Sequence, residues 1–163
     1  MVIQAVPDDT LLRDDAIELR LIRLVEIGDL SRREPNTAFL SAAPEYRFAI
    51  HRIADDLRIG RIHVRVTDDP DIVEVLGHMG YAVDEEHRRQ GYAARAIRLM
   101  TRVADRLGQR TLWVLIEPEN ISSCRAVERA GFDLVDEVDS REAALALGLG
   151  PRLRRYRKTT TST

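Results

Sequence analysis

The sequence predicts an α/β fold with a mixed central sheet, antiparallel in its N-terminal half and parallel in its C-terminal half. Two observations support this prediction. Residues 16–24, 46–54 and 58–66 follow one another as strand-like runs, and the last two are close enough to form a hairpin. From residue 91 onward helices alternate with strands, and such alternation implies parallel pairing. A chain of 163 residues fits one domain, so we expect a single domain over residues 1–163.

The N-terminal half is interpreted from its apolar periodicity. Residues 16–24 mostly alternate apolar and polar side chains, as a half-buried strand does. Residues 25–44 carry prolines, a glycine and several charges, so we expect a loop there that lies beside the substrate. Residues 72–83 are nearly continuously apolar and predict a central strand. Within it, Gly77 and Gly80 indicate a bulge or a close approach by another part of the molecule.

The C-terminal half begins with the best-defined helix. Residues 91–107 repeat apolar side chains at helical spacing, and a glycine follows as a C-cap. Residues 111–116 form a short unbroken apolar run, which is typical of a strand buried on both faces. Asn120 is a suitable N-cap for a second helix over residues 121–130, and residues 132–138 have the pattern of another strand.

Composition narrows the classes of function. The formal net charge is −2, with 44% hydrophobic and 32% charged residues, which is an ordinary globular balance. No apolar run reaches the roughly 18 residues of a membrane helix, and the N-terminus lacks a secretory signal, so we expect a cytoplasmic protein without a membrane partner. Cys124 is the single cysteine, which excludes an intramolecular disulfide and a cysteine zinc cluster. We expect no metal.

One local feature favours a different class of protein. Residues 152–158 contain five basic side chains with Tyr156 among them, a pattern that could bind nucleic acid. The acidic balance of the rest of the chain argues against this alternative, and an exposed C-terminal strand explains the same pattern. We therefore do not expect a nucleic acid partner.

Residues 83–94 have the features of an anion-binding turn, because a predicted strand leads into a basic turn that opens a long helix. At a helix start several backbone N–H groups lack partners and the macrodipole favours negative charge, so phosphate binds well there. Gly91 lets a ligand approach the backbone, while Arg88 and Arg89 would add charge-assisted bonds. The alternative is an ordinary strand–turn–helix connection with solvated arginines. The spacing matches neither a P-loop nor a dinucleotide fingerprint.

Three segments resemble the GNAT superfamily of N-acetyltransferases. The segment from Arg88 to Ala93, RRQGYA, resembles its acyl-CoA signature Q/R-x-x-G-x-G/A. The segment from Asn120 to Phe132, NISSCRAVERAGF, resembles the one that follows the next strand in these enzymes. Residues 77–83 are similar to the strand before the signature in the branch of ribosomal-protein N-terminal acetyltransferases. The resemblance implies a GNAT-like sheet in which a parallel pair of strands splays apart at the acyl-CoA site, with helices on both faces.

The resemblance implies that acetyl-CoA is the cofactor, and it assigns contacts to individual positions. The pyrophosphate would be held by the turn and the helix start, which comprise Arg88, Arg89, Gln90, Gly91, Tyr92 and Ala93. The backbone of Ala82 and Val83 would pair with the pantetheine arm like an added strand. Asn120 would bond the arm or cap its helix, and Ser123 would face the thioester.

Position 127 departs from the family pattern. Many members have a tyrosine there that protonates the leaving thiolate, whereas this chain has Val127. Ser123 or a bound water is the substitute that we consider first. Because transfer proceeds by direct attack on the thioester, no covalent nucleophile is needed, and we expect Cys124 to be a buried helix residue.

The attacking amine must lose a proton, which requires a base nearby or a relaying water. His78 and Glu74, both within the predicted central strand, are the first candidates, and an imidazole suits proton acceptance at neutral pH. A buried structural histidine and a solvated glutamate are the alternative readings of these two residues. Glu137 and Glu142 could reach the site from the opposite wall.

The sequence thus predicts an acyl-CoA-dependent N-acyltransferase that moves an acetyl group from acetyl-CoA to a primary amine. The acceptor would be a small molecule or a peptide. The alternative is a catalytically silent acyl-CoA-binding module of the same fold, because the tyrosine is missing at Val127. The resemblance also leads us to expect a homodimer.

Overall fold

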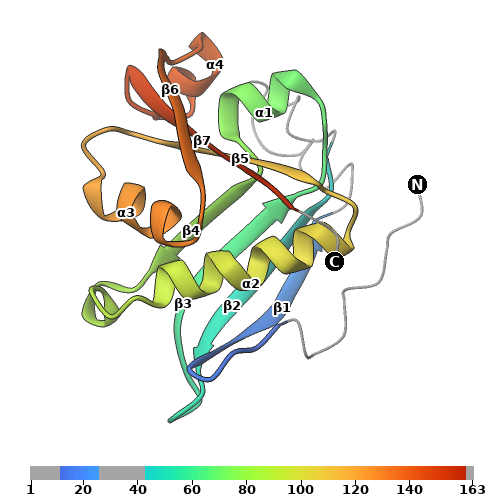
Figure 1. The fold of residues 1–163 in the computed structure, drawn as a ribbon, viewed down its shortest axis with the longest axis vertical. Helices are drawn as coiled ribbons and strands as arrows, with labels where there is room; N and C mark the ends of the chain where they lie inside the picture. The colour runs from blue at the N-terminus through green and yellow to red at the C-terminus, as the bar shows by residue number, and fades with distance from the viewer. Residues whose placement is uncertain (1–11, 26–42, 161–163) are drawn as a thin grey trace.

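The computed structural model describes residues 12–25 and 43–160. The loop predicted beside the substrate, residues 25–44, falls almost entirely between these ranges and so lies outside the described residues. Four strands form the larger sheet in the order β1-β2-β3-β4, and each pair of neighbours is antiparallel (Figure 1). Their bounds are β1 (Ile17–Val25), β2 (Glu45–Arg52), β3 (Leu57–Arg65) and β4 (Met79–Val83). The predicted antiparallel half and its hairpin are confirmed.

The strand predicted over residues 72–83 is wrong in its first part, where the chain forms helix α1 (Pro70–Leu76). The side chain of Asp69 accepts a hydrogen bond from the backbone N–H of Asp71 at 3.0 Å, and Pro70 has the φ angle that a first helical turn needs. Gly77 ends α1 at φ 69°, where a side chain would also meet the carbonyl oxygen of Trp113. Only Met79–Val83 remains as strand.

Helix α2 (Tyr92–Arg106) lies across one face of the larger sheet, after a short 3-10 turn, η4 (Glu85–His87) (Figure 1). The predicted helix and its apolar stripe are confirmed, because Ile97 and Met100 are fully buried. They belong to one core with inward side chains of the strands, among them Phe48 and Ile62. Within the described residues, no helix is both long and apolar enough to cross a membrane.

Three further strands form a smaller sheet in the order β5-β7-β6, with both pairs antiparallel. Their bounds are β5 (Thr111–Ile116), β6 (Asp133–Asp139) and β7 (Arg152–Thr159). The α/β architecture is confirmed, but the pairing expected in this half is different because β7 lies between β5 and β6. Helix α3 (Ile121–Arg129) follows β5 as predicted, and α4 (Glu142–Ala146) is a short helix that the sequence pattern did not predict.

The basic run of residues 152–158 forms β7, and the acidic residues of β6 lie opposite it. Arg155 donates two hydrogen bonds to Asp136, at 2.6 and 2.5 Å. Arg152 donates to Glu137 at 2.9 Å and to Asp139 at 2.8 Å. Three of the five basic side chains of this run, Arg152, Arg154 and Arg155, therefore pair with carboxylates of β6, which weakens the case for a nucleic-acid surface.

Candidate active site

The larger and smaller sheets meet at one end of β4 and β5. The backbone N–H of His78 donates to the carbonyl oxygen of Trp113 at 2.8 Å, and the backbone N–H of Trp113 donates to Nδ1 of His78 at 2.9 Å. Among the described residues no ladder continues from this junction between the two strands. The strands are thus joined at the start of β4 and are unpaired with each other toward Val83.

The unpaired edge of β4 is defined by its register with β3. The carbonyl of His78 accepts from the N–H of Arg65 at 2.7 Å, and the N–H of Asp84 donates to the carbonyl of Ile59 at 2.9 Å. Backbone groups alternate in direction along an antiparallel pair, so the even-numbered residues of β4 face β3. The backbone groups of Met79, Tyr81 and Val83 therefore point away from β3. Those of Ala82 point toward it.

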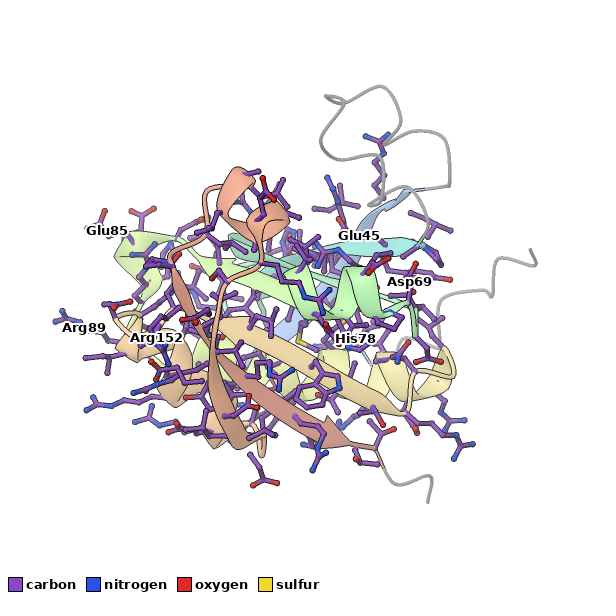
Figure 2. All side chains as sticks on the ribbon, turned by 90° about the horizontal axis from the view of Figure 1, so that it is seen from above. Glu45, Asp69, His78, Glu85, Arg89 and Arg152 are labelled. Atoms are coloured by element: carbon purple, nitrogen blue, oxygen red, sulfur yellow. The ribbon has the colours of Figure 1, made fainter. Side chains whose placement is uncertain are left out.

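The free edge leads directly into the predicted anion-binding turn. Gly91 is the N-cap of α2 at φ 79°, and no side chain of the described residues caps this helix start. The first N–H groups of α2 are therefore open to a ligand, and a side chain at position 91 would meet no atom within 4 Å of its Cβ, apart from the two adjacent residues. Arg88, Arg89 and Gln90 are exposed, and Arg89 extends outward from the body of the molecule in Figure 2.

Arg88 has a partner that the sequence did not indicate. Its Nε donates to the carbonyl oxygen of Val83 at 2.9 Å. This is one of the backbone acceptors on the free edge of β4, so Arg88 occupies a position that the amide of an added strand would use. Arg88 therefore contacts the strand edge rather than extending toward the helix start.

Helix α3 faces the same region. Oδ1 of Asn120 accepts from the backbone N–H of Ser123 at 3.3 Å, so Asn120 caps the helix as one of its two predicted roles requires. The hydroxyl of Tyr81 donates to the carbonyl oxygen of Ser123 at 3.2 Å, which connects β4 to the first turn of α3. Cys124 and Val127 are buried, with exposed fractions of 3% and 0%, as expected for the cysteine.

His78 is held as part of the junction. Its exposed fraction is 2%, so the side chain lies inside the molecule. Nε2 donates to the carbonyl oxygen of Thr67 at 2.8 Å and therefore carries the ring proton, while Nδ1 accepts from the backbone N–H of Trp113. Burial lowers the pKa of His78, against the opposing effect of these backbone bonds. Neither nitrogen is free to take a proton from a substrate.

The three glutamates predicted as candidate bases do not lie together at this junction. Glu74 lies on α1 and forms an ion pair with Arg141. Glu137 lies on β6 and pairs with Arg152 and Arg154. Glu142 is exposed in the first turn of α4. The described residues contain no group of three or more His, Cys, Asp or Glu that could hold a metal ion.

A cavity of about 250 Å³ lies beneath α1, on the side of the junction that carries His78 and Trp113. Both residues line it, together with Val73 and Glu74 from α1 and Leu115 from β5. Core-facing residues of β5 such as Val114 alternate with these, so the cavity opens on the face of the strands opposite α3. The sequence pattern missed this cavity because it depends on α1, which the apolar run concealed.

Strands β2 and β3 carry a cluster of polar side chains that contact one another. Glu45 is 4% exposed and accepts from Arg47 at 2.6 Å and from Arg65 at 2.8 Å (Figure 2 labels Glu45). Arg65 also donates to Nε2 of His63 at 3.1 Å. Burial, followed by the charge of Arg65, lowers the pKa of His63 to about 4. The cluster therefore holds His63 as a neutral imidazole at physiological pH.

The comparison with known proteins agrees with this arrangement. Residues 22–133, more than half of the chain, match the model of the Acetyltransferase (GNAT) domain. The chain therefore belongs to the GNAT acetyltransferase family. The predicted family is confirmed. No curated protein matches the chain in sequence.

Solved structures share the fold at low sequence identity. The ribosomal-protein-S5-alanine acetyltransferase from Vibrio fischeri has a TM-score of 0.59 at 15% identity, over 90% of this chain and 94% of its own. The spermidine N-acetyltransferase from Vibrio cholerae, a dodecamer, has a TM-score of 0.57 at 14% identity, over 90% and 95%. The acetyltransferase (GNAT family) from Bacillus anthracis has a TM-score of 0.57 at 16% identity and matches 69% of this chain. This chain spans only 65% of that protein's length.

Proposed function

We propose that this protein transfers the acetyl group of acetyl-CoA to a primary amine by direct attack on the thioester. One observation carries the proposal: the free backbone edge of β4 ends at Val83, five residues before the basic turn whose helix start is open to phosphate. A strand edge can take an extended ligand with amide groups, and a helix start can take its phosphates. Acetyl-CoA has both parts in this order.

The contacts of the proposed complex follow from the backbone directions. The pyrophosphate would accept hydrogen bonds from the first N–H groups of α2, beginning beside Gly91. The pantetheine arm would pair with Val83 and then Tyr81, whose backbone groups point away from β3. Ala82 is not part of this proposal because its backbone groups face β3. Arg88 would release the carbonyl of Val83 when the arm binds.

The thioester would then lie toward the junction, with Asn120 and Ser123 of α3 on one side. The cavity beneath α1 lies on the opposite face of the strands and borders His78 and Trp113, so we assign the acceptor amine to it. Of the predicted bases, we retain Glu74, which lines this cavity. We assign His78 a structural role, because both of its ring nitrogens are already hydrogen-bonded.

The acceptor class is part of the proposal. The cavity beneath α1, with a volume of about 250 Å³, suits an aliphatic amine or the first residues of a peptide. Two proteins of the same fold carry names that specify spermidine and a ribosomal-protein alanine, and we place this chain's acceptor in the same broad class of primary amines. The cytoplasm as compartment and the homodimer remain predictions.

The test is a screen of amine acceptors with acetyl-CoA, following both free thiol release and the mass of the acetylated amine. The panel would include spermidine, peptides with N-terminal serine or alanine, and a lysine peptide. We expect one class to give amine-dependent thiol release. Val127 favours a second candidate function, a silent acyl-CoA-binding module, because the position of the family's acid carries no proton donor. Binding of acetyl-CoA without turnover of any acceptor would select that candidate.

A further inference from the structure

Acetyl transfer produces a thiolate that needs a hydrogen-bond donor, and position 127 does not provide one. Val127 has an exposed fraction of 0% and belongs to the hydrophobic core. Cys124, one turn earlier, is also buried, with Sγ 4.0 Å from the carbonyl oxygen of Glu117. Neither of these two inward residues of α3 presents a hydroxyl to the edge of β4.

Tyr81 presents a hydroxyl at this place from the opposite element. Met79 and Val83, its neighbours on the same face of β4, are both buried in the core, so the Tyr81 ring also points to the α2 and α3 side of the sheet. Its hydroxyl lies 3.2 Å from the carbonyl oxygen of Ser123. The ring therefore reaches from β4 to the first turn of α3, and the backbone of the same residue lies on the free edge.

The path of the cofactor leads to this ring. In the proposed complex the pyrophosphate lies at the start of α2, and the arm follows the free edge from Val83 toward the junction at His78 and Trp113. Tyr81 is the middle residue of that edge. The arm pairs first with Val83, so its thioester end lies further along the edge, toward Tyr81 and the junction. The Tyr81 hydroxyl is then beside the arm, on the side covered by α3.

We propose that Tyr81 compensates for the missing tyrosine at position 127 by donating a hydrogen bond from its hydroxyl to the sulfur of the leaving thiolate, which stabilises the thiolate without transferring the proton. This inference rests on the proposed function. The present acceptor of this hydroxyl is a backbone carbonyl at a long hydrogen-bond distance, so a charged sulfur would be a stronger competing acceptor.

The chemistry is balanced as follows. The amine nitrogen forms a bond to the carbonyl carbon, the C=O electrons move to oxygen, and their return breaks the C–S bond and leaves the electron pair on sulfur. The amine proton goes to the base or to water. Burial raises the pKa of Tyr81 to about 12, well above the value of about 8.5 typical of a thiol. Tyr81 thus remains protonated and stabilises the thiolate as a donor, and solvent supplies the proton that makes the free thiol.

The chain offers a matched control in Tyr156. This tyrosine is also buried and also contacts α3, but its hydroxyl donates to Glu128 at 3.0 Å, near the opposite end of the helix. Tyr156→Phe removes a buried hydroxyl from the same helix without touching the edge of β4. It therefore reports the structural cost of such a change.

The experiment compares Tyr81→Phe, Tyr156→Phe and the wild type, using acetyl-CoA and the best amine of the acceptor panel. We expect kcat of Tyr81→Phe to fall at least tenfold and up to about 10³-fold, with KM for acetyl-CoA changed less than about threefold. Tyr156→Phe should keep kcat per folded molecule. Equal kcat for Tyr81→Phe and the wild type overturns the inference and leaves the proposed function standing. If the wild type itself neither binds acetyl-CoA nor releases thiol, the proposed function has failed instead.

A second variant covers the case in which Tyr81→Phe does not fold. Replacement of Tyr81 by 3,5-difluorotyrosine keeps the ring and the hydroxyl and makes the hydroxyl a stronger donor. We expect kcat of this variant to be at least equal to that of the wild type near neutral pH. Across a series of acetyl thioesters whose leaving thiols differ in pKa, we expect kcat to depend less on that pKa than it does in the wild type. A hydroxyl that only supports α3 would leave that dependence unchanged, which contradicts the inference.

Discussion

His78 and Trp113 are joined by two hydrogen bonds, one from backbone to backbone at 2.8 Å and one from the Trp113 N–H to the imidazole at 2.9 Å. A third bond, from Nε2 to the carbonyl of Thr67, fixes the ring. The imidazole thereby supplies the backbone of β5 with a partner at the point where β4 turns away. The separation of the two strands begins at this side chain.

His78→Leu should destabilise the protein without a specific loss of catalysis. The change leaves the N–H of Trp113 and the carbonyl of Thr67 without their buried partner, and such groups cost about 1–3 kcal/mol. Urea unfolding measures the loss, and His51→Leu, at a partly buried position on β2, serves as the control. If the wild-type kcat rises with pH near neutrality, and His78→Leu loses that rise while its stability is unchanged, His78 is the base after all.

The sequence predicted the elements whose signals are local. Asn120 and the periodic stripe of residues 91–107 define α3 and α2, since caps and spacing are properties of neighbouring residues. The apolar run of residues 72–83 predicts one strand, because an unbroken apolar run does not distinguish a short buried helix from a strand. Asp69 and Pro70 were the signals that could have identified α1.

The features that the sequence did not predict depend on contacts between segments that are distant along the chain. The position of β7 between β5 and β6 brings Arg155 beside Asp136, and neither charge indicates that pairing when read alone. Arg88 was predicted to face phosphate, whereas its Nε reaches back to the carbonyl of Val83. The sequence does not distinguish Tyr81 as a site residue, because a tyrosine in an apolar strand resembles a core residue. Only the position of α3 shows where its hydroxyl lies.

Acid should destabilise the fold partly through His63. The pKa of His63 is about 4 in the folded protein against an ordinary value of 6.5, so the unfolded chain takes up a proton first as the pH falls. The stability is complete above pH 6.5 and declines between pH 6.5 and 4, by at most about 3 kcal/mol. Unfolding curves at pH 7 and pH 5 should show a smaller acid loss in His63→Gln than in the wild type. An equal loss in both would mean that another group dominates.

Gly91→Asp should abolish acetyl-CoA binding, because a carboxylate would enter the proposed phosphate position and repel the ligand. Gly108→Asp is a matched control, since Gly108 also has a positive φ, 86°, and open space around it, at the far end of α2. Arg88→Ala should weaken binding by no more than about 1–3 kcal/mol, the scale of one charge-assisted bond, because it removes a positive charge near the turn but also frees the carbonyl of Val83 for the pantetheine arm. Calorimetric titration measures all three, and normal binding by Gly91→Asp would move the phosphate site elsewhere.

Filling the cavity beneath α1 should affect the acceptor and leave the cofactor alone. Val73→Phe places a larger side chain in its lining, so we expect KM for the amine to rise at least tenfold while the affinity for acetyl-CoA stays the same. Val135→Phe, at an exposed position on β6, controls for the added ring. If KM for acetyl-CoA rises and KM for the amine does not change, the cavity beneath α1 belongs to the cofactor and not to the acceptor amine.

The most direct test of the account is thermal unfolding of the wild-type protein with and without acetyl-CoA. A ligand that binds only the folded state stabilises it by RT ln(1 + [L]/Kd), about 2.7 kcal/mol at a hundredfold excess over Kd. We predict an upward shift of Tm that grows with acetyl-CoA concentration and disappears in Gly91→Asp. A folded protein whose Tm does not change at millimolar acetyl-CoA would contradict the assignment of the β4 edge and the α2 start as its binding site.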